Sequence, residues 1–278
     1  MHKTINIIIL LILLQGCNLM KKNGKDQGLK TTDEEIEFVD LHLPLSYIPT
    51  NVNSLEDALE NPENIEELTL SYKEKLNDIP PEISKLKNLK RLNIVGHNID
   101  EIPDFIGDLE RLEILVLSHN KIKVIPKSIF KLTNLKTFKI SNNELYVIDD
   151  DVKNLTNLVY FNISGNKLTA LPGTLADLSN LQALDIGLNS IKEIPEQFCY
   201  FKNLKRIRAC YNNLTTIPEC FSKITSLEEV IFCANLIDTI KMDFSEMKNL
   251  KILDLRSNKL NEEFLNGLEE KMPHCIVR

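Results

Sequence analysis

The six cysteines and five histidines are the residues of this 278-residue chain best suited to bind a metal ion or to act in catalysis. The cysteines are Cys17, Cys199, Cys210, Cys220, Cys233 and Cys275, and the histidines are His2, His42, His97, His119 and His274. No two cysteines have the Cys-x-x-Cys spacing of zinc sites, and no histidine lies at a catalytic-motif spacing from a nucleophile and an aspartate. The chain also lacks a glycine-rich phosphate loop. We therefore expect no metal, no cofactor and no enzymatic activity.

Cys17 ends a segment that has the features of an export signal. His2 and Lys3 give the segment a basic start, and an uninterrupted apolar run follows over residues 7–14. This run is too short to cross a bilayer as a stable helix, which takes about 20 residues. The sequence LQGC at residues 14–17 resembles the lipobox of bacterial lipoproteins, in which the signal peptide is cut before a cysteine that then carries lipid.

The lipobox resemblance implies a signal peptide over residues 1–16 and a lipid on Cys17. The lipid would anchor the protein to a membrane of the bacterial cell envelope. Residues 17–33 are polar, contain four lysines and show no periodicity, so we expect a flexible tether there. An ordinary signal peptide with an incidental cysteine is the alternative.

A 23-residue step organises the rest of the chain and must position any functional side chains. Each unit opens with a leucine, at Leu89, Leu112, Leu135, Leu158, Leu181, Leu204, Leu227 and Leu250. Ile65 opens one further unit, 24 residues before Leu89. Within a unit, Phe161 and Ile163 alternate with polar neighbours, as in a short half-buried strand. A fixed period between about 20 and 50 residues indicates a solenoid, in which stacked units share one core.

The stretch Leu158–Asn180, LVYFNISGNKLTALPGTLADLSN, shows one unit in full. It resembles the pattern LxxLxLxxNxLxxLPxxLxxLxN of bacterial leucine-rich-repeat proteins, and the resemblance covers nine units over residues 65–260. It implies an α/β fold: a horseshoe-shaped solenoid with a parallel β-sheet on its concave face and short 3₁₀, helical or extended segments on its convex face. We expect residues 34–64 and 261–278 to cap its two ends, because the outer faces of terminal units meet water.

An asparagine follows the predicted strand in seven of the units. A side-chain amide at this place can bond to backbone groups that the turn leaves unpaired, so a column of asparagines should tie each unit to the next. The predicted structural ladder comprises Asn120, Asn143, Asn166, Asn189, Asn212, Asn235 and Asn258. His97 takes this place in the second unit, where we expect it to act as a structural substitute in a looser rung.

A proline comes six residues after the ladder position in most units and suits the turn onto the convex side, because it fixes φ and needs no hydrogen bond. Asp149 and Lys241 replace it in two units, where we expect a less regular outer wall. Ser54 followed by Asp57 resembles a capping box and predicts a helix over residues 55–60.

The C-terminal end departs from the repeat pattern. Residues 262–271 read as a helix, and residues 275–277 read as a final strand over the open core. The formal charge of the whole chain is −7, which argues against nucleic-acid binding because phosphate contacts need clustered lysine and arginine.

The strand residues between the core positions should point to the concave face. Arg206 beside Glu229, and Asp185 beside Arg208, are predicted neighbours on adjacent strands and should partly neutralise each other. Apolar, aromatic and basic side chains on this face form the predicted partner-binding site: Ile114, Val116, Tyr160, Leu188, Arg206, Arg208, Tyr211 and Ile231.

Cys210 and Cys233 occupy the same place in adjacent units. Neighbouring strands lie about 5 Å apart, which is within reach of a disulfide. Parallel side-chain directions make that geometry poor, so we expect two unpaired small residues filling a crowded column.

These features predict a non-catalytic protein–protein interaction module, lipid-anchored in the bacterial envelope, that binds a protein or peptide partner on its concave face. One alternative is a structural envelope protein that contacts other copies of itself or cell-wall polymer. The other is a cytosolic interaction scaffold, which would apply if residues 1–17 are not a signal.

Overall fold

The computed structural model describes residues 54–70, 75–244 and 246–278. They belong to one compact unit, residues 49–278. The predicted signal peptide, Cys17, the tether and the first part of the N-terminal cap lie outside the described residues.

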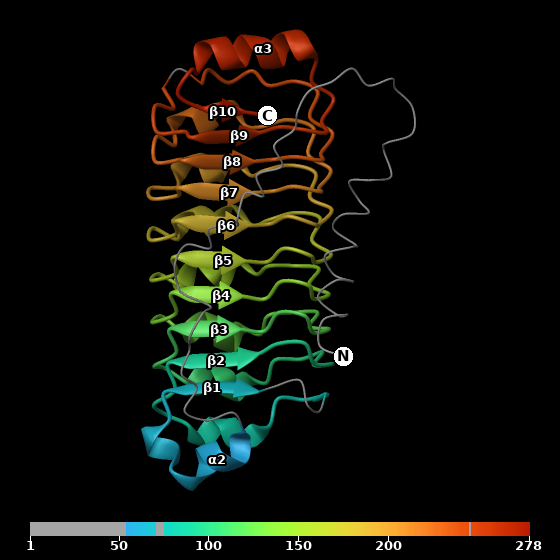
Figure 1. Ribbon diagram of the computed structural model, residues 1–278. Helices are drawn as coiled ribbons and strands as arrows, with labels where there is room; N and C mark the ends of the chain where they lie inside the picture. The colour runs from blue at the N-terminus through green and yellow to red at the C-terminus, as the bar shows by residue number, and fades with distance from the viewer. Residues whose placement is uncertain (1–53, 71–74, 245) are drawn as a thin grey trace, which may run out of the picture. The chain divides into compact units, whose positions relative to one another are not determined.

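Ten parallel strands form one sheet, and each strand pairs with the next one along the chain (Figure 1). The strands are β1 (Glu67–Leu70), β2 (Arg91–Ile94), β3 (Ile114–Val116), β4 (Thr137–Lys139), β5 (Tyr160–Asn162), β6 (Ala183–Asp185), β7 (Arg206–Arg208), β8 (Glu229–Ile231), β9 (Ile252–Asp254) and β10 (Ile276–Val277). From β2 to β9, residues one repeat apart are direct neighbours, as Tyr160 is of Thr137 and Ala183. The predicted solenoid and its register are confirmed.

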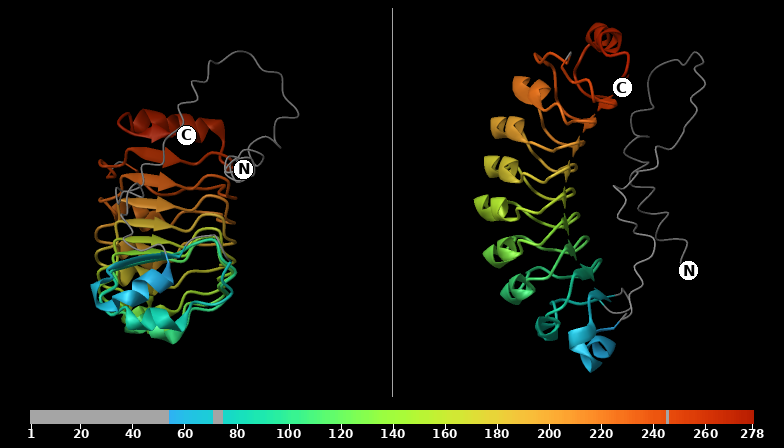
Figure 2. Two further views of the ribbon diagram at one scale, coloured as in Figure 1. Left: turned by 60° about the horizontal axis from the view of Figure 1, so that its bottom comes forward. Right: turned by 90° about the vertical axis from the view of Figure 1, so that its left-hand side faces the viewer.

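Short 3₁₀ segments line the side of the solenoid opposite the sheet, and the sheet follows the inner side of the curve (Figure 2). They are η1 (Pro62–Asn64), η2 (Pro81–Lys85), η3 (Asp104–Asp108), η4 (Lys127–Lys131), η5 (Asp150–Asn154), η6 (Gly173–Asp177), η7 (Glu196–Tyr200) and η8 (Glu219–Lys223). From η2 to η8, the residue before each segment is the predicted proline or, before η5, Asp149.

The expectation of a less regular outer wall at Asp149 is wrong. Its φ of −71° matches that of the prolines, and its carboxylate accepts a hydrogen bond from the backbone N–H of Asp151 at 2.9 Å. An aspartate can therefore replace the proline here, because it starts the 3₁₀ segment as a side-chain cap. At Lys241, by contrast, the described residues 240–244 contain no 3₁₀ segment.

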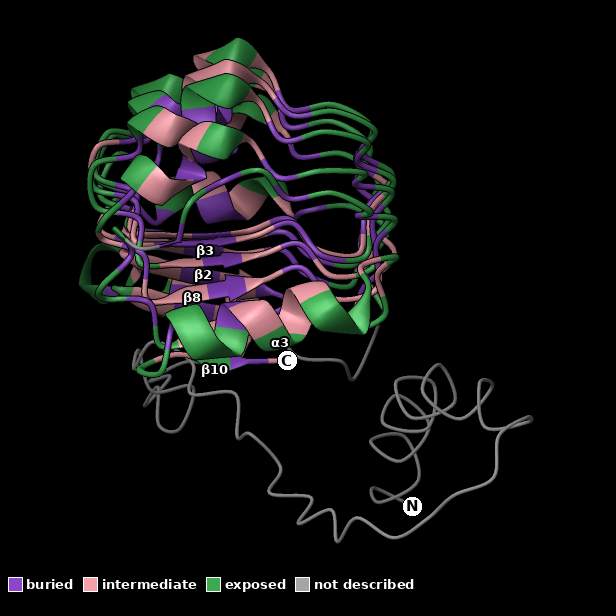
Figure 3. Ribbon diagram, turned by 90° about the horizontal axis from the view of Figure 1, so that it is seen from above, coloured by how far each residue is buried: buried purple, intermediate pink, exposed green. Residues whose placement is uncertain are grey.

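One continuous apolar core fills the space between the sheet and the 3₁₀ segments. Figure 3, which looks along the solenoid, shows that buried residues occur both in the strands and in the segments opposite them. The leucines that open the units, from Leu89 to Leu250, are at most 1% exposed. Phe138 and Phe161 stack on adjacent strands with their ring centroids 5.5 Å apart. No single unit could bury this apolar stripe, so the core depends on stacking.

Helices close the two ends of the described unit. The helix α2 (Leu55–Glu60) begins after Ser54, whose hydroxyl accepts from the N–H of Asp57 at 3.1 Å. At the other end, α3 (Glu262–Lys271) precedes β10, which pairs with β9. Both helices have the bounds that the sequence predicts. None of the helices in the described residues is long and apolar enough to span a membrane.

Candidate functional site

The ladder asparagines fix the strand ends from inside the solenoid. The side-chain amide of Asn166 donates to the carbonyl oxygens of Ile163 at 3.0 Å and Ile140 at 3.1 Å, and its oxygen accepts from the N–H of Leu145 at 2.9 Å. The other ladder asparagines form the same kind of contacts. Each rung is therefore hydrogen-bonded to the preceding one, which holds the concave face in a fixed register.

His97 takes the place of the asparagine in the second unit. Its Nδ1 accepts from the N–H of Leu76 at 3.2 Å, and its Nε2 lies 3.3 Å from the carbonyl oxygen of Leu70. With Nδ1 as the acceptor, Nε2 is the ring nitrogen that can donate to the Leu70 carbonyl. The N–H of Ile99 lies 3.4 Å from the side-chain oxygen of Asn120, compared with 2.9 to 3.0 Å in the later rungs. The first rungs are therefore looser, as expected.

A second asparagine ladder on the outside of the solenoid was not predicted. Its members close the units, and their amides donate to backbone carbonyl oxygens of the preceding unit or, for the first member, of the N-terminal cap: Asn88, Asn134, Asn157, Asn180, Asn203 and Asn249. The signal was present in the sequence, because the last letter of the repeat pattern is this asparagine. These side chains are exposed, so each bond competes with water and contributes less than a buried one.

The eight residues of the predicted partner-binding site fall into two groups. Six lie on strands and are half-buried: Ile114, Val116, Tyr160, Arg206, Arg208 and Ile231. The other two, Leu188 and Tyr211, lie beyond the ends of β6 and β7 and are 46% and 44% exposed. The most accessible apolar area of the predicted site is therefore at the edge of the concave face.

Neighbouring side chains hold several residues of the strand group in place. Arg206 donates from Nη2 to the Glu229 carboxylate at 2.8 Å, as the register predicts. The Lys139 ammonium lies 5.0 Å from the ring centroid of Tyr160, and the Asn162 amide donates to the Tyr160 hydroxyl at 3.2 Å. These contacts make the centre of the face rigid and leave part of its polar surface already paired.

Asp185 has an unusual environment for a carboxylate on this face. Burial raises its pKa, although the hydrogen bond from the Gly187 N–H, 3.1 Å long, and the nearby Arg208 guanidinium act in the opposite direction. Asn162 makes the equivalent bond on the preceding rung, from the Ser164 N–H at 3.0 Å. An amide can thus replace this carboxylate without loss of the turn.

We expect Asp185→Asn to raise the thermal unfolding midpoint at neutral pH. Because the folded pKa lies above the unfolded one, the charged carboxylate destabilises the fold. This destabilisation develops as pH rises from the unfolded to the folded pKa and is fully present above both. The thermal midpoints of the wild type and the variant should differ at pH 7 and converge near about pH 3, below the unfolded pKa of the carboxylate. A constant difference across the range would show that charge is not the cause.

The residue before each ladder position has a left-handed backbone, with φ between 52° and 80°, at Gly96, His119, Asn142, Gly165, Leu188, Tyr211, Ala234 and Ser257. The N–H of Leu188 donates to the Cys210 carbonyl at 2.8 Å, and the N–H of Tyr211 to the Cys233 carbonyl at 3.0 Å, so cross-rung bonds enforce the turn. Glycine adopts this conformation freely, whereas other residues pay roughly 1–2 kcal/mol. Leu188 and Tyr211 are therefore strained as well as exposed.

Two disulfides link consecutive units, and one of them lies beside these residues. Cys210 and Cys233 are bonded with their Cα atoms 4.6 Å apart, so the expectation of two unpaired cysteines is wrong. Both lie past the ends of β7 and β8, where the chain already turns, and the parallel directions assumed for strand side chains do not apply. A second disulfide, which was not predicted, joins Cys199 in η7 to Cys220 in η8, with a Cα separation of 5.6 Å.

Leu236, two residues beyond the left-handed Ala234 of the next rung, is another exposed apolar residue. It is 39% exposed and follows the ladder asparagine of the next rung. We call Leu188, Tyr211 and Leu236 the edge patch; they come from three consecutive rungs.

The remaining cysteine, Cys275, is a free thiol near the C-terminus. Burial raises the pKa of this thiol to about 11, so it stays protonated at neutral pH. The described residues contain no cluster of side chains that could hold a metal ion.

Two family models match part of the chain. A model described as a leucine-rich repeat region matches residues 147–275, and one described as a leucine rich repeat matches residues 110–168. The units within residues 110–275 are leucine-rich repeats. No match to the chain is found among the curated proteins.

Solved structures resemble the chain over most of its length. A leucine-rich-repeat protein of Leptospira interrogans shares 29% identity with a TM-score of 0.74, covering 77% of this chain and 54% of that one. The Arabidopsis receptor kinase HAESA, solved with the peptide hormone IDA and the co-receptor SERK1, shares 30% identity with a TM-score of 0.65. That match covers 71% of this chain and 35% of the other.

A third similar structure is the PEPR1–AtPEP1 complex, at 27% identity and a TM-score of 0.63, covering 71% of this chain and 29% of the other. The leucine-rich-repeat chain described here thus spans about half of the Leptospira chain and about a third of the other two.

Proposed function

We propose that this leucine-rich-repeat chain is a lipid-anchored protein of the bacterial envelope that binds a protein or peptide partner on its concave face, with the edge patch as its main anchor. The observation that carries the proposal is the presence of two large exposed side chains, Leu188 and Tyr211, in a left-handed column whose other members are glycine, small or polar residues. Backbone strain of this kind concentrates at functional sites, and tyrosine is favoured as an interface anchor.

Similarity to ligand-binding structures supports a protein or peptide partner. HAESA was solved in complex with a peptide hormone, and 71% of the present chain resembles part of that receptor. The half-buried Arg206, Arg208 and Tyr160 would form the polar floor beside the edge patch. A partner segment lying along the strands could contact both groups. The proposed role requires no catalysis by this chain.

The disulfides support the proposed location. Disulfides persist in oxidising compartments and are rare in the cytosol, where thiols are kept reduced. The Cys199–Cys220 and Cys210–Cys233 bonds therefore favour export over the alternative of a cytosolic scaffold. Export is also what the apolar run and the lipobox-like LQGC of residues 14–17 predict.

We expect Cys17→Ala to prevent lipid attachment and to move the protein from the membrane fraction to the soluble fraction. The variant would carry no acyl chains, and each methylene of such a chain that is buried in the bilayer contributes about 0.8 kcal/mol to membrane binding. The measurement is metabolic labelling with a fatty acid, followed by cell fractionation. Cys275→Ala should label and fractionate like the wild type. A wild-type protein that incorporates no fatty acid would refute the lipid anchor.

Partner binding is tested by affinity capture from an envelope extract with the mature chain. Proteins retained by the wild type should be lost with the double variant Leu188→Gly/Tyr211→Gly. They should be retained by Lys153→Ala, which changes an exposed residue of η5 on the other side of the solenoid. Retention of the same proteins by the double-glycine variant would exclude the edge patch as the anchor.

A further inference from the structure

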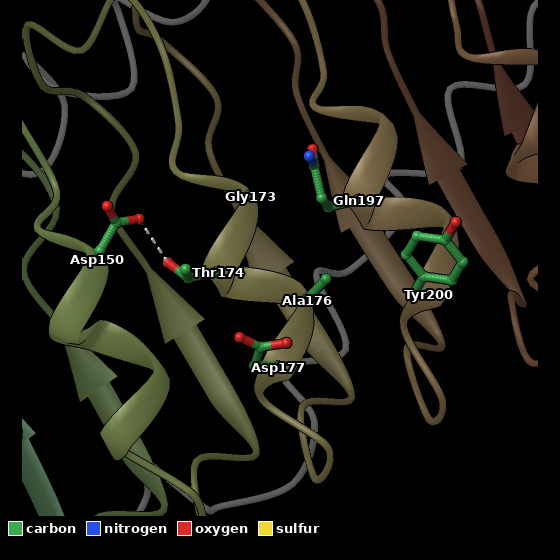
Figure 4. A pocket seen from close by; sticks show the side chains of 7 residues that line it. All are labelled: Asp150, Gly173, Thr174, Ala176, Asp177, Gln197 and Tyr200. Atoms are coloured by element: carbon green, nitrogen blue, oxygen red, sulfur yellow. Dashed lines mark hydrogen bonds between the residues drawn. The ribbon is translucent and has the colours of Figure 1, made fainter.

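A pocket of about 340 Å³ lies on the convex side, away from the sheet. It is lined by residues of three consecutive 3₁₀ segments, η5, η6 and η7: Asp150, Gly173, Thr174, Ala176, Asp177, Gln197 and Tyr200. Figure 4 shows Asp150 and Tyr200 at its two ends, with Thr174, Ala176 and Asp177 between them. The proposed partner-binding function does not use this surface.

Two departures from the repeat pattern create the pocket. Gly173 begins η6 at a position where Asp150 and Glu196 stand in the neighbouring units. A Cβ atom on Gly173 would come within 2.8 Å of the Gln197 side chain, so the glycine leaves room for that amide. Tyr200 stands in a column otherwise occupied by charged or amide residues, such as Asp177. At 75% exposed, it is the most exposed large apolar or aromatic residue of the described chain.

The walls of the pocket are held by bonds that need no ligand. The Thr174 hydroxyl donates to the Asp150 carboxylate at 3.0 Å, which links η5 to η6 (Figure 4). The disulfide from Cys199 to Cys220 ties η7, which carries Gln197 and Tyr200, to η8. Because the lining side chains are already held in place, ordering them costs less free energy when a ligand binds.

The lining chemistry selects for one class of ligand. Asp150 and Asp177 offer acceptor oxygens, Gln197 offers both a donor and an acceptor, and Tyr200 offers an exposed aromatic ring with a hydroxyl at its tip. No basic residue lines the pocket, so phosphate, sulfate and carboxylate groups would be repelled by the two aspartates. By contrast, two other pockets among the described residues each have at least one lysine in their lining.

We propose that this convex pocket binds an uncharged saccharide unit. The apolar face of a pyranose ring would lie against Tyr200, and its hydroxyl groups would bond to the two aspartates and to Gln197. A sugar matches this lining because it presents apolar C–H groups on the faces of its ring and several hydroxyl groups around the rim. The pocket gives the solenoid a second surface, which could bind a glycan of the envelope while the concave face binds a protein.

The test is a titration of the full mature chain, with its disulfides intact, followed by NMR. Three uncharged probes are used, namely the β-1,4-linked trimer of N-acetylglucosamine, cellotriose and maltotriose. Glucosamine, which carries a positive charge, is titrated as the comparison. We expect at least one of the uncharged probes to bind saturably. Tyr200→Ala should weaken that binding about tenfold or more, since aromatic anchors dominate small interfaces. Gly173→Ala, which pushes the Gln197 amide away, should weaken it as well.

The matched controls separate this site from the proposed partner-binding function. Tyr146→Ala removes another exposed tyrosine, 59% exposed, that lines a different pocket, and should leave saccharide binding unchanged. The Leu188→Gly/Tyr211→Gly variant should also bind the probe like the wild type. The proposal is overturned if none of the probes binds, if Tyr200→Ala binds as well as the wild type, or if only cationic glucosamine binds, which would assign the pocket to an amine.

Discussion

Replacing both Cys210 and Cys233 with serine should lower the free energy of unfolding by about 2–4 kcal/mol. The disulfide closes a loop with a sequence separation of 23 residues, so it restricts the unfolded chain, and the double variant loses that restriction. The two bonded cysteines also accept, through their backbone carbonyls, the hydrogen bonds from the N–H groups of Leu188 and Tyr211. Urea unfolding under non-reducing conditions measures the change.

The second disulfide provides a comparison. Cys199 and Cys220 close a loop of almost the same length, with a separation of 21 residues, and their double serine variant should be destabilised to a similar extent. Cys275→Ser serves as the control, because that thiol forms no disulfide. If a reducing agent leaves the urea midpoint of the wild type unchanged, neither disulfide contributes as stated.

Asn166→Ala should cost about 1–3 kcal/mol of stability, because it leaves a buried backbone donor unpaired. The N–H of Leu145 bonds to this side chain and would lose its partner inside the core. The two main carbonyl acceptors are less affected, since Ile140 also accepts from Asn143, and Ile163 also accepts from Asn189. The loss should therefore correspond to one orphaned N–H group.

Asn157→Ala is the matched control for the buried ladder. The same side chain is removed from the outer ladder, where the amide of Asn157 donates to the Thr133 carbonyl at 2.9 Å in an exposed position. Water can replace that bond, so the cost should stay below about 1 kcal/mol. Equal shifts of the urea midpoint for the two variants would contradict the difference in burial on which the ladder argument rests.

The register of the sheet could be predicted because two periodicities agree. Side chains alternate along each strand with a period of two, and the units repeat every 23 residues, so Phe161 in the core requires Tyr160 on the concave face. The capping helices have a different kind of signal in the sequence. Ser54 and Asn261 each supply a side-chain cap directly before a short amphipathic stretch.

Features that depend on the turns could not be predicted in the same way. The direction of the Cys210 and Cys233 side chains follows from the left-handed turn after each strand rather than from strand geometry. That turn did leave a signal, since Gly96 and Gly165 stand in the same column as Leu188. A column that holds glycine in some units predicts positive φ in all of them.

The convex pocket had a weaker signal. It requires a missing Cβ at Gly173 and an aromatic ring at Tyr200 in neighbouring units, which is apparent only when the columns of the outer wall are compared. No motif spacing links them, because their proximity depends on the stacking of η6 on η7.

Titration of a captured partner against glycine variants of the edge patch tests the central claim most directly. Leu188→Gly and Tyr211→Gly remove the backbone strain, roughly 1–2 kcal/mol per residue, at an entropic cost to the fold of about 0.5–1 kcal/mol for each glycine. Each variant should therefore be as stable as the wild type or slightly more stable in urea. The double variant should nevertheless bind the partner more weakly by about 1–3 kcal/mol, while Lys153→Ala binds normally. Unchanged affinity in the double variant would contradict the claim that the solenoid tolerates this strain in order to bind.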